Sequence, residues 1–130
     1  MNYKVIIRSE GRGWTDEKIT EGKVSQVKNG VRLAYSLDGD GCELIANAKR
    51  VVQKRSGDQC VAIEFVEGKI TKCEIGSGSF RGSYNIFTKS LKFASGKNGF
   101  KLSLEYENGS DGELIKLVLT AYVKRDLEKK

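Results

Sequence analysis

The stretch Val31-Arg-Leu-Ala-Tyr-Ser-Leu37 alternates apolar side chains with polar or small ones at a period of two. Successive side chains of a β-strand point to opposite faces, so the pattern predicts a strand with one buried face. Residues 100–106 and 115–123 repeat the alternation. Asn29-Gly30 stands directly before the first stretch and predicts a tight hairpin turn, because both residue types tolerate positive φ.

Turn signals separate weaker alternating runs along the rest of the chain, and no segment has an apolar stripe of helical length. Strands joined by such short turns must be antiparallel, because a parallel crossover needs about a dozen residues. The sequence therefore predicts an all-β fold of about 8–10 strands, closed into an antiparallel up-and-down barrel that hides its edges. A two-sheet sandwich is the main alternative. The other turn signals are Asp38-Gly-Asp-Gly41, Ser56-Gly-Asp58, Glu67-Gly68, Gly96-Lys-Asn-Gly99 and Asn108-Gly-Ser-Asp-Gly112.

The composition is that of a single globular domain over residues 1–130, with 38% hydrophobic and 31% charged residues. The N-terminal segment Met1–Arg8 lacks the apolar region of a signal peptide, and no apolar run is long enough to cross a membrane. The three cysteines are an odd number and have no CxxC spacing. We therefore expect a cytoplasmic protein without disulfides and without a membrane partner.

The residues of common catalytic and metal sites are missing from the chain. There is no histidine to serve as a general base, and Cys42, Cys60 and Cys73 are too far apart for a zinc cluster. Asp38-Gly-Asp-Gly41 lacks the further ligands of a calcium loop. The glycines of 76–82 precede an expected strand and not a helix, so they do not predict a phosphate site. We expect no enzyme activity, no metal and no cofactor.

Four stretches give the chain a likeness to a known family. They are Leu33-Ala-Tyr35, Phe65-Val-Glu-Gly68, residues 78–91 and Lys101-Leu-Ser-Leu-Glu-Tyr106. In their order and spacing the chain resembles the YwiB-like family of bacterial proteins. The resemblance implies a lipocalin-like, calycin-type barrel, and it implies fold more than function. Gly78-Ser-Phe-Arg-Gly82 departs from the family pattern, which has a proline before the long strand.

The charge is unevenly distributed along the chain. The net charge is +6, and between Ile75 and Leu104 there are five basic residues and no acidic one. Basic residues among aromatics are typical of surfaces that bind single-stranded nucleic acid. The strand alternation, however, places most of these aromatics on the face opposite the lysines. Binding of a nucleic acid or another polyanion through 81–101 is therefore the second hypothesis, with Lys89, Lys92, Lys97 and Lys101 as its candidate residues.

The first hypothesis is a small barrel that binds a small molecule in its mouth or lumen, because closed barrels of this size can hold one small ligand. Its candidate ligand-binding residues are Trp14, Tyr35, Arg81 and Tyr84. A structural or dimeric interaction protein is the third hypothesis. The expected oligomeric state is a monomer or a homodimer.

Overall fold

The computed structural model describes residues 2–109 and 111–123, which form ten strands. The strands are β1 (Asn2–Gly11), β2 (Trp14–Val27), β3 (Gly30–Leu37), β4 (Asp40–Ala46), β5 (Arg50–Ser56), β6 (Gln59–Val66), β7 (Ile70–Ser77), β8 (Phe80–Gly96), β9 (Gly99–Asn108) and β10 (Leu114–Val123). Each strand pairs antiparallel with the next, and β1 pairs with β10, so the sheet closes. The predicted all-β, up-and-down, calycin-like barrel is confirmed. No helix that could span a membrane occurs among the described residues.

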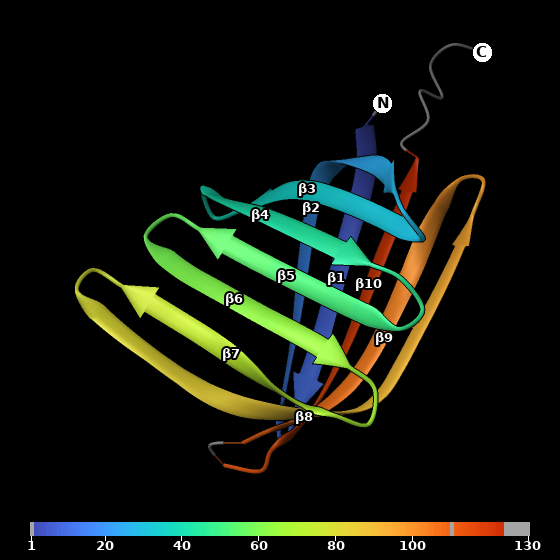
Figure 1. The fold of residues 1–130 in the computed structure, drawn as a ribbon. Coiled ribbons are helices and arrows are strands. Elements are labelled where there is room, and N and C mark those ends of the chain that lie inside the picture. Colours follow the sequence, from blue (N-terminus) through green and yellow to red (C-terminus); the bar gives the residue numbers. More distant parts are fainter. Residues whose placement is uncertain (1, 110, 124–130) are drawn as a thin grey trace.

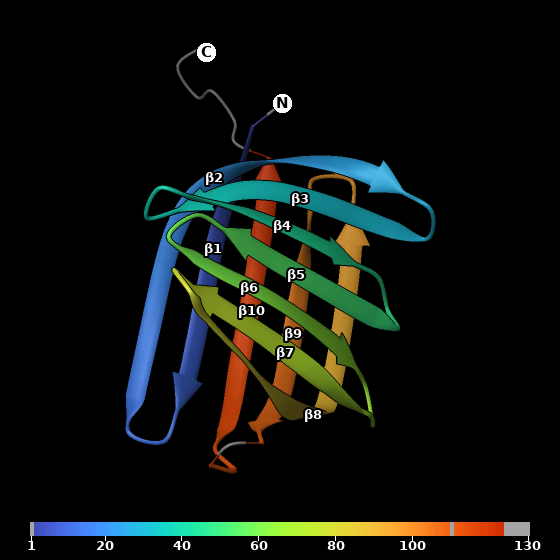
Figure 2. The ribbon, with the colours of Figure 1, turned by 60° about the vertical axis from the view of Figure 1, so that its left-hand side comes forward.

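The barrel is flattened into two layers whose strands cross (Figures 1 and 2). The front layer contains β3–β7, and the back layer contains β1, β9 and β10. Two long strands serve both layers and form the corners between them. Strand β2 pairs with β1 through residues 14–23 and with β3 through 22–27. Strand β8 pairs with β7 through 80–87 and with β9 through 86–96, with a bulge between Thr88 and Ser90.

The hairpin before β3 differs in one detail from the prediction. Val27 pairs with Gly30, so the two turn residues are Lys28 and Asn29, one position earlier than predicted. Asn29 adopts the expected positive φ of 63°. Gly30 is already a strand residue, and the Ala46 carbonyl oxygen fills the space that a Cβ would need. The glycine is therefore required where β3 and β4 approach each other closely, and not for the turn.

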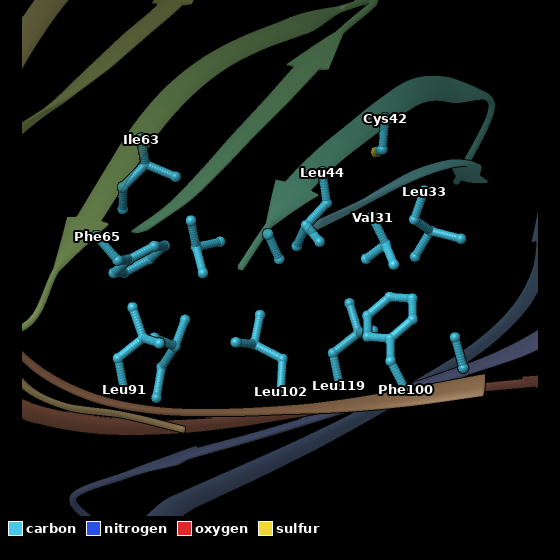
Figure 3. Close-up of a cluster of buried hydrophobic side chains, with 14 of the residues drawn as sticks. Val31, Leu33, Cys42, Leu44, Ile63, Phe65, Leu91, Phe100, Leu102 and Leu119 are labelled. Carbon is cyan, nitrogen blue, oxygen red and sulfur yellow. The ribbon is translucent and has the colours of Figure 1, made fainter. Parts of the chain in front are cut away.

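The core lies between the two layers, and its side chains follow the predicted alternation. Val31, Leu33 and Tyr35 are buried as expected, and Leu37 packs against their cluster. In Figure 3, side chains of the front layer such as Leu44 face side chains of the back layer such as Leu102 and Leu119. The central part of the barrel is therefore filled by its own side chains.

Candidate functional site

A cavity of about 200 Å³ lies in the barrel lumen, on the inner side of β5 and β6 near the hairpin that joins them. Its apolar lining comes from strands of both layers and consists of Val61, Ile63, Phe65 and Leu117. Its polar lining consists of Gln53, Arg55, Cys73, Tyr84 and Tyr106. The period of two explains this convergence, because every one of these residues occupies an inward position of its strand.

A smaller hollow of about 170 Å³ lies at the rim of the barrel, beside the start of β6 and the end of β7. Its apolar lining includes Ile75 and Phe80, and Val61 lines both the hollow and the cavity. The Phe80 ring lies over Gly82, where a Cβ would be 3.1 Å from the ring, and it is 58% exposed. An exposed aromatic ring at the rim thus borders a hollow that shares Val61 with the polar cavity.

Apart from the Arg55 guanidinium, the titratable groups that line the cavity are uncharged at neutral pH. Burial raises the pKa of Tyr84, and contact with the neighbouring Cys73 raises it further. Burial also raises the pKa of Tyr106, to about 12, and that of the Cys73 thiol. The cavity therefore presents two neutral phenols, which donate and accept hydrogen bonds, beside a thiol that is not activated as a nucleophile.

The raised pKa of Tyr106 predicts that the protein loses stability in alkali. The unfolded chain loses the phenolic proton near pH 10, whereas the folded protein keeps it up to about pH 12. Between these values the folded state binds more protons, so its stability is complete below pH 10 and falls as the pH rises toward 12. Urea unfolding across this range should show a smaller fall for Tyr106→Phe than for the unaltered protein. An equal fall in both would contradict the prediction.

Three hydrogen bonds hold the front wall of the cavity and its hairpin. The Gln53 Nε2 donates a hydrogen bond of 2.7 Å to the Tyr35 hydroxyl. The Arg55 Nε donates one of 2.7 Å to Oδ2 of Asp40, a carboxylate that is only 7% exposed. The backbone N–H of Asp58 donates to Oδ1 of the same carboxylate at 3.3 Å. Asp40 therefore fixes both the position of Arg55 and the β5–β6 hairpin, and it balances the guanidinium charge.

The β1–β2 turn lies at the lower end of the back layer (Figure 2), where Glu113, the residue before β10, binds it. The Trp14 Nε1 and the backbone N–H of Arg12 donate to Oε2 of Glu113, at 2.7 and 2.9 Å. The backbone N–H of Gly109 donates to the Asn85 carbonyl at 2.8 Å, which brings the segment after β9 alongside β8. The carboxylates of Asp111 and Glu113 are close enough to raise the pKa values of Tyr84 and Tyr106.

Comparison with known proteins supports the fold. The sequence matches no protein-family model and none of the curated proteins. The crystal structure of the YwiB protein from Bacillus subtilis superposes with a TM-score of 0.81, covering 95% of this chain and 91% of that one at 22% identity. The chain is YwiB-like in fold. The resemblance to the YwiB-like family that its strand sequences suggested is thus confirmed for the barrel architecture.

The YwiB-like barrel brings only some of the sequence candidates to the cavity. Tyr84 lines it, and Tyr35 reaches it through its hydrogen bond with Gln53. Trp14 lies at the same end of the barrel but is bound to Glu113 and does not line the cavity. Arg81 is on the outer face, where its Nη1 donates to the carbonyls of Gly78 and Phe80 at 3.0 and 2.8 Å. The structure therefore does not place Arg81 in the lumen.

Several residues that line the cavity are not among the candidates predicted from the sequence. Gln53 and Arg55 occupy inward positions of β5, and Tyr106 occupies the last part of β9. The signal for the first two was present, because they are polar residues at positions where the alternation starting from Val51 predicts buried side chains. The alternation of residues 100–106 predicts Tyr106 on the buried face, and nothing in the local sequence places it beside an open volume.

The predicted polyanion residues lie on the outer face of the barrel and in its turns. Lys92, Lys97 and Lys101 are exposed, and Lys89 Nζ is 3.6 Å from Oε1 of Glu107. Most aromatic side chains of this segment pack against the core, but Phe87 alternates with the buried Ile86 and pairs with Glu107, the ion-pair partner of Lys89. Phe93 packs in the interior against the buried Phe100, with ring centroids 5.7 Å apart. Polyanion binding through 81–101 stays a prediction, and Tyr84, Phe93 and Phe100 pack in the interior, where they cannot stack on bases beside the lysines.

A wider groove of about 790 Å³ lies on the outer face over β5–β8. Its lining includes Lys54, Glu74, Arg81 and the exposed Cys60, which alternate with the inward residues of the same strands.

Cys42 and Cys73 are buried, and the described residues contain no group of three or more side chains that could hold a metal ion.

Proposed function

We propose that this protein binds a small organic molecule in the cavity of its barrel lumen. The observation that supports the proposal is the lining, in which a few polar side chains, among them Tyr84, Tyr106 and Gln53, converge beside an apolar wall from both layers. Ligand sites are typically apolar hollows with a few polar groups that orient the ligand. The volume of about 200 Å³ lies below the roughly 300–1,000 Å³ of sites for drug-sized ligands. The proposed ligand is therefore compact.

Binding is a better proposal than catalysis for this cavity. A catalytic base or nucleophile works with a pKa tuned toward neutrality. Here burial shifts the pKa values of Cys73, Tyr84 and Tyr106 upward, away from the pH at which they would react. Arg55 remains a cation in its ion pair with Asp40. These groups suit recognition by hydrogen bonds and packing.

Filling the cavity should remove binding without unfolding the barrel. Leu117 lines the cavity from β10, so Leu117→Phe adds volume where the ligand would lie. With benzyl alcohol as a neutral probe, backbone NMR titration should show shifts confined to residues around the lumen. The substitution should weaken its binding by about ten-fold or more, because overlap with a packed ring excludes the ligand.

The neighbouring residue supplies a matched control. Val118 precedes Leu119 on β10 and points away from the lumen, so Val118→Phe adds a similar bulk outside the cavity. Its affinity for benzyl alcohol should equal that of the unaltered protein. Equal weakening by both substitutions, or shifts spread over the outer face, would show that the probe does not bind in the lumen.

A further inference from the structure

The wall of the cavity is aromatic on one side. The rings of Phe65 and Tyr106 pack together with centroids 5.0 Å apart and planes tilted by 60°. Tyr84 contributes a third ring from β8. The faces of aromatic rings carry negative potential, so a cation placed over them is attracted, more strongly where water is excluded. Three rings from β6, β8 and β9 therefore form a surface suited to a positively charged group.

Two carboxylates, those of Asp111 and Glu113, lie just before β10 and close enough to the phenols to affect them. Glu113 accepts its hydrogen bonds from the neutral donors of Arg12 and Trp14, and Asp111 Oδ1 accepts one of 2.9 Å from the Glu113 backbone N–H. Neither carboxylate makes an ion pair with a side chain of residues 2–109 or 111–123. Their negative charge is hydrogen-bonded but not neutralised, and it acts on the phenols of the cavity.

The one cation in the cavity lining is already balanced. The Arg55 Nε lies 2.7 Å from Oδ2 of Asp40 in an ion pair. Both groups are largely buried, with side-chain exposures of 25% and 9%. The remaining titratable groups of the lining are the neutral phenols and thiol described above. The Arg55–Asp40 pair is thus neutral, while Asp111 and Glu113 place negative charge near the phenols, although the whole chain has a net charge of +6.

We propose that the lumen cavity takes a small organic cation, an amine on a compact apolar body, with the ammonium group over the rings of Phe65, Tyr84 and Tyr106. The inference rests on the ligand-binding function proposed above and specifies its chemical class. The apolar body lies along Val61 toward the rim. A carboxylate in the same place would face the two carboxylates of the β9–β10 segment and gain nothing from the ring faces.

Three probes of one shape and different charge separate the possibilities. Benzylammonium, benzyl alcohol and benzoate are titrated into the full chain at neutral pH and low salt, and lumen resonances are followed by NMR. We expect benzylammonium to bind about ten-fold more tightly than benzyl alcohol, and benzoate to bind least, from the combined cation–π and charge terms. Equal or tighter binding of the alcohol or the carboxylate would overturn the cation preference alone. No binding by any probe would overturn the lumen function itself.

A charge-neutralising variant tests the role of the acidic segment. Asp111→Asn with Glu113→Gln keeps the acceptor oxygens for the Glu113 N–H, Arg12 N–H and Trp14 indole while removing two charges. The ratio of benzylammonium to benzyl alcohol affinity should fall about five-fold. Glu105→Gln is the control, because this carboxylate lies on the outer face near Lys116 at 3.6 Å. If Glu105→Gln lowers this affinity ratio as much as the double variant does, the role assigned to Asp111 and Glu113 is contradicted.

Discussion

Phe65→Ala is expected to lower the free energy of unfolding by about 3–5 kcal/mol, the usual cost of deleting a buried aromatic side chain. Phe65 is 1% exposed and lies between the two layers of the barrel (Figure 3). Its ring packs on Tyr106 with centroids 5.0 Å apart, so the substitution also removes an aromatic pair and enlarges the lumen cavity. Urea unfolding at neutral pH, followed by the fluorescence of Trp14, measures the loss.

Phe80→Ala is the matched control, because it deletes the same side chain at the exposed rim. With 58% of Phe80 exposed, we expect a loss of about 1 kcal/mol or less. Similar losses in the two variants would mean that Phe65 does not pack as described. The comparison also separates the inner cavity from the hollow at the rim, since Phe65 lines the first and Phe80 the second.

Most of the fold follows from local sequence. The alternation of Val31, Leu33 and Tyr35 specifies which face of β3 is buried, and short turns leave only antiparallel neighbours. The one error, the position of the β2–β3 turn, has a long-range cause. Gly30 is required by the carbonyl of Ala46, which approaches from β4 only after the sheet has formed.

The cavity could be predicted only in part. Tyr84 was accessible to prediction because its phenol stands at an inward position of a long strand. The same alternation places Arg81 on the opposite face from Tyr84, so its exclusion from the lumen could have been predicted as well. Arg55 could have been found by extending the period of two along β5, where it is a charged residue at an inward position.

The assembly of the barrel end could not be predicted from one sequence. Trp14 and Glu113 meet across 99 positions of the chain, and only the closure between β1 and β10 brings them together. The bulge of β8 at Thr88 and Ser90 also changes which side chains of that strand face inward. Contacts of this kind depend on register between distant strands, which local patterns do not encode.

Gly22→Ala is expected to cost about 1–3 kcal/mol, the usual range for overpacking a well-packed site. Gly22 is the corner of β2, where it pairs with Tyr3 of β1 and with Tyr35 of β3. A Cβ there would lie 2.6 Å from the backbone oxygen of Ala34 and 3.0 Å from the Tyr35 Cβ. Backbone cannot move aside as a flexible side chain can, so the two strands must separate at the point where the front and back layers join.

Gly41→Ala tests whether this cost comes from the corner and not from the loss of a glycine. Gly41 lies in β4, and a Cβ built there meets no atom within 4 Å. Its substitution should leave stability unchanged or raise it by up to about 1 kcal/mol, because alanine restricts the unfolded chain. Urea midpoints of the two variants should therefore move in different directions or by clearly different amounts. A Gly22→Ala midpoint equal to that of Gly41→Ala would show that β2 can bend without the close approach, and the two-layer geometry around the cavity would then need another cause.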